Sequence, residues 1–197
     1  MVEATTAPAA LRRIDVELVV NGEARTLAIE PRETLAEVLR DRLGLTGAKV
    51  SCDAQVCGAC TVLVDGLPVS SCTFLAVDAD GKRVRTVEGL AVDGRLSPLQ
   101  GAFIDQAAFQ CGFCTPGMLM AATALLEENP SPSRADVVHG LEGNLCRCTG
   151  YEPIIAAVLQ AATAGGDPGQ PVVADTGPGV GGESTVDPAA EPIEAQQ

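Results

Sequence analysis

The eight cysteines fall into two groups of four, and this pattern limits the possible folds more than any other feature of the sequence. The second group is divided by a segment with helical periodicity. Its members are Cys111, Cys114, Cys146 and Cys148. When the intervening segment folds back on itself, four thiols form a closed site for iron or zinc. Each pair also precedes a helix-start signal, Thr115-Pro116 or Thr149-Gly150. The positive end of a helix dipole favours an anionic thiolate–metal centre.

The first group has the C-x4-C-x2-C spacing, with a distant fourth cysteine, of plant-type [2Fe–2S] ferredoxins. Its members are Cys52, Cys57, Cys60 and Cys72. Gly58 and Ala59 are small enough for backbone N–H groups to approach a cluster closely. A four-cysteine zinc site is the alternative, but zinc knuckles usually have C-x2-C at both ends, and only Cys57 and Cys60 match that spacing.

The second group alone is compatible with zinc or with an iron–sulfur cluster. Rieske ligation requires two histidines, and His139 is the one histidine of the chain. We therefore expect His139 to be a surface or helix-packing residue.

Composition restricts the partners and the compartment. A net charge of −13 disfavours nucleic acid and anionic membranes as partners, and no apolar run has the length of a transmembrane helix. The N-terminus has no apolar stretch typical of a signal peptide, so we expect a cytoplasmic protein. Because disulfides are disfavoured there, the cysteines are better explained as metal ligands.

Periodicity predicts a small mixed sheet with one helix in the first half of the chain, an α+β unit. Alternation predicts a strand from Ile14 to Val20, and Asn21-Gly22 joins it to a second strand. Thr34 to Glu37 forms a capping box for a short helix. The remaining strands are predicted at 61–64, 67–70 and 83–87.

The second half predicts four short helices in a compact bundle. Ser97 caps the first, with Leu99, Phe103, Ala107 and Phe109 or Gln110 on its inner side. The others begin at Thr115-Pro116, after Ser133, and at Thr149 or Gly150. We expect a flexible arm at 1–12, domains at 13–90 and 91–164, and a disordered acidic tail rich in Gly, Pro and Ala at 165–197.

Three segments together resemble the two-cluster iron–sulfur subunit of the xanthine oxidase family of molybdenum hydroxylases. They are KVSCDAQVCGACTVLVDG followed by SSC, QCGFCTPGM, and GNLCRCTGY. The resemblance covers about residues 13–163. It implies a β-grasp, ferredoxin-like domain with one [2Fe–2S] cluster on the first cysteine group. It also implies a helical domain with a second [2Fe–2S] cluster on the second group.

The resemblance implies a hetero-oligomer, a dimer of heterotrimers. A large subunit holds the molybdenum–pterin cofactor, and a medium subunit holds FAD. This chain relays single electrons from molybdenum through the helical-domain cluster and then the ferredoxin-domain cluster to FAD or another acceptor. By resemblance, Gln110 contacts the pterin and Cys148 lies nearest to it. Many relatives have glycines where this chain has Ser51, Asp53 and Gln55, which predicts a different conformation of the first cysteine loop.

The sequence therefore predicts an electron-transfer subunit of an oxidoreductase. We identify no substrate pocket or catalytic base in this chain, so substrate oxidation is expected on a partner. Two alternatives remain open at this point: a free-standing two-cluster ferredoxin and a zinc-binding structural module. Carbon monoxide, aldehydes, purines and other N-heterocycles all remain possible substrates of the complex.

Overall fold

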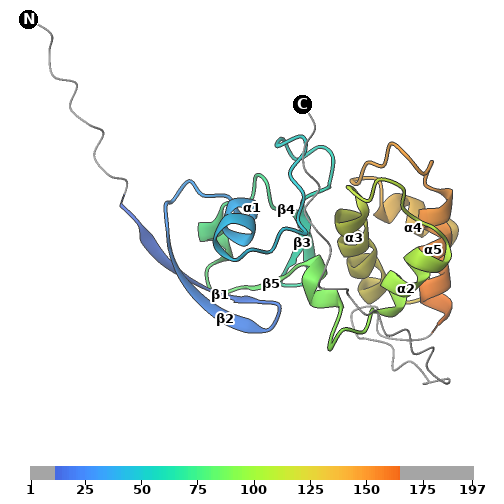
Figure 1. Ribbon diagram of the computed structural model, residues 1–197, viewed down its shortest axis with the longest axis horizontal. Coiled ribbons are helices and arrows are strands. Elements are labelled where there is room, and N and C mark those ends of the chain that lie inside the picture. The colour runs from blue at the N-terminus through green and yellow to red at the C-terminus, as the bar shows by residue number, and fades with distance from the viewer. Residues whose placement is uncertain (1–11, 165–197) are drawn as a thin grey trace, which may run out of the picture.

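The computed structural model describes residues 12–164, which form a mixed sheet beside a group of helices (Figure 1). The sheet has the order β2-β1-β5-β3-β4. Its strands are β1 (Ile14–Val20), β2 (Glu23–Ile29), β3 (Thr61–Val64), β4 (Leu67–Ser70) and β5 (Arg83–Arg85). This arrangement confirms the α+β class. The predicted arm at 1–12, except Arg12, and the predicted tail at 165–197 lie outside the described residues.

Two hairpins and one parallel pairing build the sheet. The turns at Asn21-Gly22 and Asp65-Gly66 have positive φ at both central residues, as two-residue hairpin loops of the type I′ kind require. β5 then lies parallel to β1 and antiparallel to β3, and so joins the hairpins. It ends at Arg85, two residues before the predicted end. There Asn21 accepts a hydrogen bond from the Thr86 amide (2.8 Å), and the chain turns into a 3-10 helix, η3 (Val87–Leu90).

One face of the sheet is covered by a short helical segment that begins as predicted. Thr34 and Glu37 form the capping box, and α1 (Leu35–Glu37) continues as a π-helix, η1 (Val38–Arg42). Leu35 and Leu39 are fully buried in the core of this half, together with side chains from β1, β3 and a second 3-10 helix, η2 (Ala76–Ala79). The π-helix was not expected.

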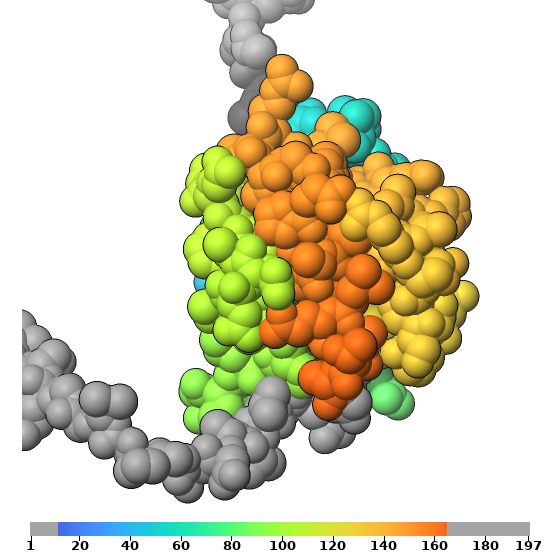
Figure 2. Space-filling view, turned by 90° about the vertical axis from the view of Figure 1, so that its right-hand side faces the viewer, coloured from blue at the N-terminus to red at the C-terminus, as the bar shows by residue number. Residues whose placement is uncertain are grey.

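In the second half of the described chain, up to residue 164, there are four helices: α2 (Pro98–Asp105), α3 (Thr115–Glu128), α4 (Arg134–Gly140) and α5 (Glu152–Thr163). Figure 2 shows α5 on the outer face, between α2 and α4. Ser97 and Ser133 form the caps of α2 and α4, the first with Gln100 and the second with Asp136. The core of this half also contains Leu63 of β3, because α3 packs directly on that strand.

Two details of the helical prediction were wrong. α5 begins at Glu152 rather than at Thr149 or Gly150, since Gly150 and Tyr151 have positive φ and cannot belong to a right-handed helix. α2 ends at Asp105, and the chain leaves the helix through Ala107, whose φ is +48°. Ala107, Phe109 and Gln110 are therefore exposed rather than on an inner helix face.

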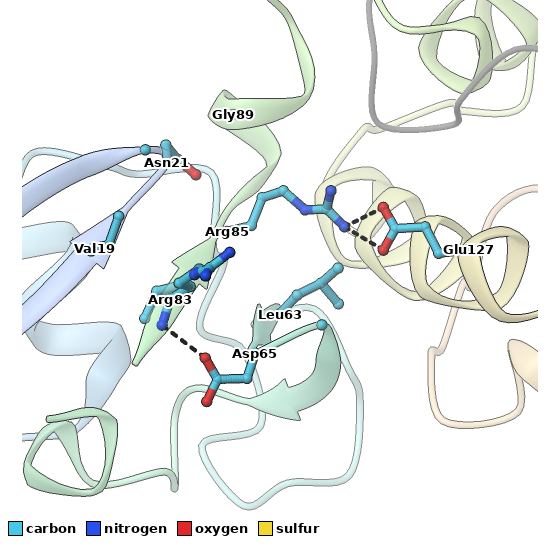
Figure 3. Close-up of a pocket in the computed structure, with 11 residues that line it drawn as sticks. Val19, Asn21, Leu63, Asp65, Arg83, Arg85, Gly89 and Glu127 are labelled. Atoms are coloured by element: carbon cyan, nitrogen blue, oxygen red, sulfur yellow. Dashed lines mark hydrogen bonds and ion pairs between the residues drawn. The ribbon is translucent and has the colours of Figure 1, made fainter. Parts of the chain in front are cut away.

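A second contact between the halves lies away from the cysteines. Arg85 of β5 donates two hydrogen bonds to the Glu127 carboxylate of α3, at 2.6 and 2.7 Å (Figure 3). The pair borders a groove of about 580 Å³ whose walls come mainly from β1, β5 and the β3–β4 turn. None of the residues that line this groove is a cysteine, so the cysteine chemistry lies elsewhere. Within residues 12–164, no helix is long and apolar enough to cross a membrane.

Candidate metal centres

The first cysteine group is brought together by the β3–β4 hairpin. Cys60 immediately precedes β3 and Cys72 follows β4 by two residues, so pairing of the two strands places both at the same end of the hairpin. Their side chains are in hydrogen-bond contact with each other, and both are buried. Cys52 and Cys57 form the other contact pair, on the outer side of the loop, and Cys52 is exposed. The group is thus two pairs of thiols.

Backbone N–H groups of the loop point at the sulfur of Cys52. The amides of Val56 and Cys57 each lie 3.4 Å from Cys52 Sγ. Hydrogen bonds from Val56, Ala54 and Cys57 lower the pKa of Cys52 to about 6, because they stabilise the thiolate. This loop is therefore preorganised for an anionic sulfur ligand.

The loop uses positive φ at positions without glycine. Asp53 has a φ of +51° and Gln55 a φ of +57°, in the left-handed region that favours glycine. Gln55 is held there because its side chain accepts a hydrogen bond from Thr73 Oγ1 (3.1 Å) and its backbone N–H bonds to Cys72. Burial raises the pKa of Cys72, and this amide hydrogen bond lowers it in part. The glycine-like backbone is thus present without the glycines. The predicted difference in loop conformation from the relatives stays a prediction.

The second group is assembled from the segments that precede α3 and α5. Cys114 is the N-cap residue of α3, and Cys146 and Cys148 lie just before α5. Cys148 Sγ lies 3.6 Å from Cys111 Sγ, and both residues are exposed. Cys114 and Cys146 form the inner pair and are only partly exposed. The structure therefore brings these four thiols together, also as two pairs.

The inner and outer thiols of this group differ in electrostatics. Burial, with contributions from Cys146 and Cys111, raises the pKa of Cys114 to about 12. Burial also acts to raise the pKa of Cys146, but hydrogen bonds from the Thr149 hydroxyl (3.2 Å) and amide (3.5 Å) help to lower it below its usual value. The hydrogen bond to Cys111 raises the pKa of Cys148. A bound metal would deprotonate all four thiols.

The pairing of the thiols fits a binuclear iron–sulfur cluster better than a single zinc ion. A tetrahedral zinc site draws four thiolates around one ion at about 2.3 Å. Within residues 12–164, no three His, Cys, Asp or Glu side chains surround a common point closely enough to hold one ion. A [2Fe–2S] cluster held by four cysteines has two irons to ligate, so thiols in pairs suit it. The hydroxyl of Thr115, the residue after Cys114, also fits a cluster. Its Oγ1 is buried without a protein hydrogen-bond partner, and a sulfur acceptor would supply one.

The other predicted site residues occupy different environments. Gln110 is exposed beside Cys111 at the outer edge of the second group. His139 lies on the surface, with its side chain 84% exposed and 3.2 Å from Glu142, as expected for a residue outside the metal centres.

Two residues that shape the second site were not predicted. The Asn144 side chain is buried, and its Nδ2 donates to the Gly58 carbonyl in the first cysteine loop (2.8 Å). The Tyr151 hydroxyl accepts a hydrogen bond from the Cys146 amide (2.9 Å) and donates to the Asn144 carbonyl (3.2 Å). Both residues belong to the GNLCRCTGY segment, whose polar side chains flank the cysteines. The position of these two polar residues beside the cysteines was the sequence signal that could have identified them.

Comparisons with known proteins agree with this geometry. Residues 18–91 match the family model described as a 2Fe-2S iron-sulfur cluster binding domain, and residues 86–159 match the one described as a [2Fe-2S] binding domain. The nicotine 6-hydroxylase small subunit of Paenarthrobacter nicotinovorans is 55% identical over 79% of this chain and 94% of its own length. The xanthine dehydrogenase iron-sulfur-binding subunit of Escherichia coli O157:H7 is 48% identical over 74% of this chain and 92% of its own.

The chain belongs to the small iron–sulfur subunits of the molybdenum hydroxylases. A chain in the crystal structure of quinoline 2-oxidoreductase from Pseudomonas putida 86 has the same fold, with a TM-score of 0.75 and 48% identity. The match covers 78% of this chain and 96% of that one. As a small iron–sulfur subunit, the chain carries two [2Fe–2S] clusters and serves electron transfer as part of a multi-subunit oxidoreductase. The zinc alternative is not supported.

Proposed function

We propose that this small subunit relays single electrons from a molybdenum-binding large subunit toward a FAD-binding medium subunit. The observation that carries the proposal is the arrangement of the two cysteine groups. Each has one edge exposed to solvent, and the groups are linked between those edges by a hydrogen bond from the Leu145 amide to the Cys57 carbonyl (2.9 Å). This arrangement would let the chain accept electrons at one exposed edge and release them at the other.

Each cysteine group would hold one [2Fe–2S] cluster, which when bound exchanges one electron at a time. The proposed ligands of the first cluster are Cys52, Cys57, Cys60 and Cys72. Those of the second are Cys111, Cys114, Cys146 and Cys148. The support is the contact pairing of the thiols, the amide hydrogen bonds to Cys52, and the unpartnered hydroxyl of Thr115. We place the domain boundary near residues 90–91, in the region where the two family matches overlap.

The entry edge would be formed by Cys111 and Cys148 of the second group. Both are exposed, and Gln110 beside them is exposed as well. Three large apolar residues nearby in the sequence are exposed to solvent, with exposed fractions of 42% for Phe109, 45% for Phe113 and 53% for Leu145. An apolar rim around exposed thiols suits burial against a partner. In this arrangement the Gln110 amide contacts the pterin of the large subunit, and Cys148 is the ligand nearest to it.

The exit edge would be formed by the loop that carries Cys52. Cys52 is exposed, and Val50 and Val56 beside it are 39% and 63% exposed. The medium subunit would dock here and receive the electron.

The relatives support a larger assembly. They are named as subunits, and the aldehyde oxidoreductase of Megalodesulfovibrio gigas matches 74% of this chain with only 16% of its own length. The homologous unit there is thus a small part of a long polypeptide. We propose a large and a medium partner subunit, assembled as a dimer of heterotrimers.

We also propose an N-heterocyclic substrate for the complex. Relatives at 47% and 55% identity carry the names of nicotinate dehydrogenase and nicotine 6-hydroxylase subunits, and one structural relative is a quinoline 2-oxidoreductase. Assay of the purified complex with nicotine, nicotinate and quinoline, against aldehydes, tests this point.

The experiment that tests the relay is Cys114→Ser in the purified complex, with Cys52→Ser as its reciprocal. Loss of the Cys114 ligand should remove one of two electron paramagnetic resonance signals and stop electron delivery to the acceptor, because the other group is then cut off from the large subunit. Cys52→Ser should remove the other signal. If the Cys114→Ser complex kept full turnover without the affected signal, the proposed order would be wrong.

A further inference from the structure

The two cysteine loops are in contact around Gly58 and Asn144, and this contact is here called the joint. The side-chain hydrogen bonds between the two loops come from Asn144. Asn144 Nδ2 donates to the Gly58 carbonyl at 2.8 Å and lies 3.2 Å from Thr61 Oγ1. Asn144 and Gly58 are 86 residues apart along the chain, so this contact is purely tertiary. Asn144 is 6% exposed, and water therefore cannot easily replace these bonds.

The backbones in the joint are in direct contact. Gly58 has a φ of +68°, and a Cβ there would overlap the Gly143 carbonyl and the Asn144 side chain. A Cβ at Gly117, in the first turn of α3, would overlap the Gly58 carbonyl. Three segments thus pack closely here, with backbone contacts at Gly58 and Gly117, and the Asn144 side chain supplies a hydrogen bond from the second cysteine loop to the first.

The joint lies between one cysteine of each group. The Cys57 carbonyl accepts a hydrogen bond from the Leu145 amide (2.9 Å), and Leu145 immediately precedes Cys146. One hydrogen bond and one residue therefore separate the main chains of Cys57 and Cys146. On the far side, the Tyr151 hydroxyl bonds to both the Cys146 amide and the Asn144 carbonyl, which fixes the Asn144 to Cys146 segment.

We propose that Asn144 is a positioning residue for electron transfer between the two cysteine groups. It holds the Leu145 amide on the Cys57 carbonyl and so fixes the distance and the bonded route between the sites. With clusters held by the two groups, the centre at the second group would give up one electron and be oxidised, and the centre at the first group would accept it and be reduced. This inference rests on the proposed function, since it requires both groups to hold redox centres.

The test is Asn144→Asp in the full complex. Aspartate has the same shape but no donors when ionised, and its oxygens would face the Gly58 carbonyl. The matched control is Glu127→Gln, which weakens a different contact between the halves, the Arg85 ion pair (Figure 3), away from the cysteines. Iron and sulfide content and the two paramagnetic signals establish that both clusters are loaded.

The decisive readouts are the magnetic interaction between the two reduced clusters and the rate of electron transfer between them after flash reduction. We expect Asn144→Asp to weaken the interaction and to slow the transfer by about 10- to 100-fold, the range by which metal affinity or activity falls when outer-shell partners of metal ligands are removed. Glu127→Gln should behave as the wild type. An unchanged interaction and rate in Asn144→Asp with both clusters loaded would overturn the inference.

Thr61→Val provides the second variant if Asn144→Asp fails to fold or to load. This variant removes two hydrogen bonds of the Thr61 hydroxyl, the longer one from Asn144 and the one to the Gly58 carbonyl (2.7 Å). The hydrogen bond from Asn144 to the Gly58 carbonyl is kept. A smaller shift in the same direction supports the inference, and no shift refutes it. If the wild type itself lacked two clusters, the proposed function would fail before this question arose.

Discussion

Replacement of Tyr151 by Phe tests how the second cysteine loop is stabilised. The variant keeps the ring, which packs against the helical core, and removes only the hydroxyl. That hydroxyl accepts from the Cys146 amide at 2.9 Å and donates to the Asn144 carbonyl at 3.2 Å, both in partly buried positions. A donor or acceptor that loses its partner in a buried site costs about 1–3 kcal/mol, and partial access of water places this case at the lower end.

The expected loss of stability is about 1–2 kcal/mol, or roughly 2–8 °C in Tm for a unit of this size. The assay compares midpoints of wild type and variant by far-ultraviolet circular dichroism at one heating rate, because release of a cluster makes unfolding irreversible. Absorbance of the cluster is followed in the same scan and should be lost at a lower temperature in the variant. If the wild type and the variant had the same midpoint by circular dichroism and the same midpoint by cluster absorbance, this hydroxyl would have no stabilising role.

Gly117→Ala should destabilise the protein by about 1–3 kcal/mol and impair cluster loading, since the added Cβ meets backbone in a packed joint. Its control is Gly101→Ala in α2, where an added Cβ would have no neighbour within 4 Å. This change should stabilise the protein by roughly 0.5–1 kcal/mol. If both variants lost stability, the protein would be intolerant of alanine at helical glycines in general, and the close packing at Gly117 would not be the cause. In cluster-free protein, iodoacetamide should modify Cys52 first at pH 7 and more slowly below about pH 6, since the lowered pKa makes it a thiolate at neutral pH. Preferential labelling of Cys114 at neutral pH, identified by peptide mass analysis, would contradict the electrostatics of the site, because its pKa is raised to about 12.

Local signals predicted much of the fold. Thr34, Ser97 and Ser133 each precede a helix as the sequence predicts, and the structure shows a reciprocal capping box at all three. Asn21-Gly22 forms the expected turn. These predictions succeed because the interactions involved span only a few residues.

The failures arise in the segments that surround the second cysteine group. The Thr149 hydroxyl bonds to the Tyr151 amide and to Cys146 rather than capping a helix, which delays α5 to Glu152. Phe109 is exposed although it is a large apolar residue, because the chain leaves α2 before reaching it. No pattern in one sequence shows that a partner would cover such a side chain.

The cysteines of the candidate site could be predicted from the sequence, but the residues that hold the cysteine loops in place could not. Cysteine spacing and family resemblance identified all eight thiols that the structure brings together in pairs. The contact of Asn144 with Gly58 could not be predicted, because it joins residues 86 positions apart. The left-handed backbone at Gln55 was likewise hidden, since glutamine gives no signal for positive φ and depends on its bond from Thr73.

The central claim, that the eight cysteines hold two [2Fe–2S] clusters, is tested most directly by metal and sulfide analysis of the purified chain combined with spectroscopy of its reduced form. Two clusters predict about four iron and four acid-labile sulfide per chain and two distinct paramagnetic signals. A colourless preparation with stoichiometric zinc and no labile sulfide would contradict the account.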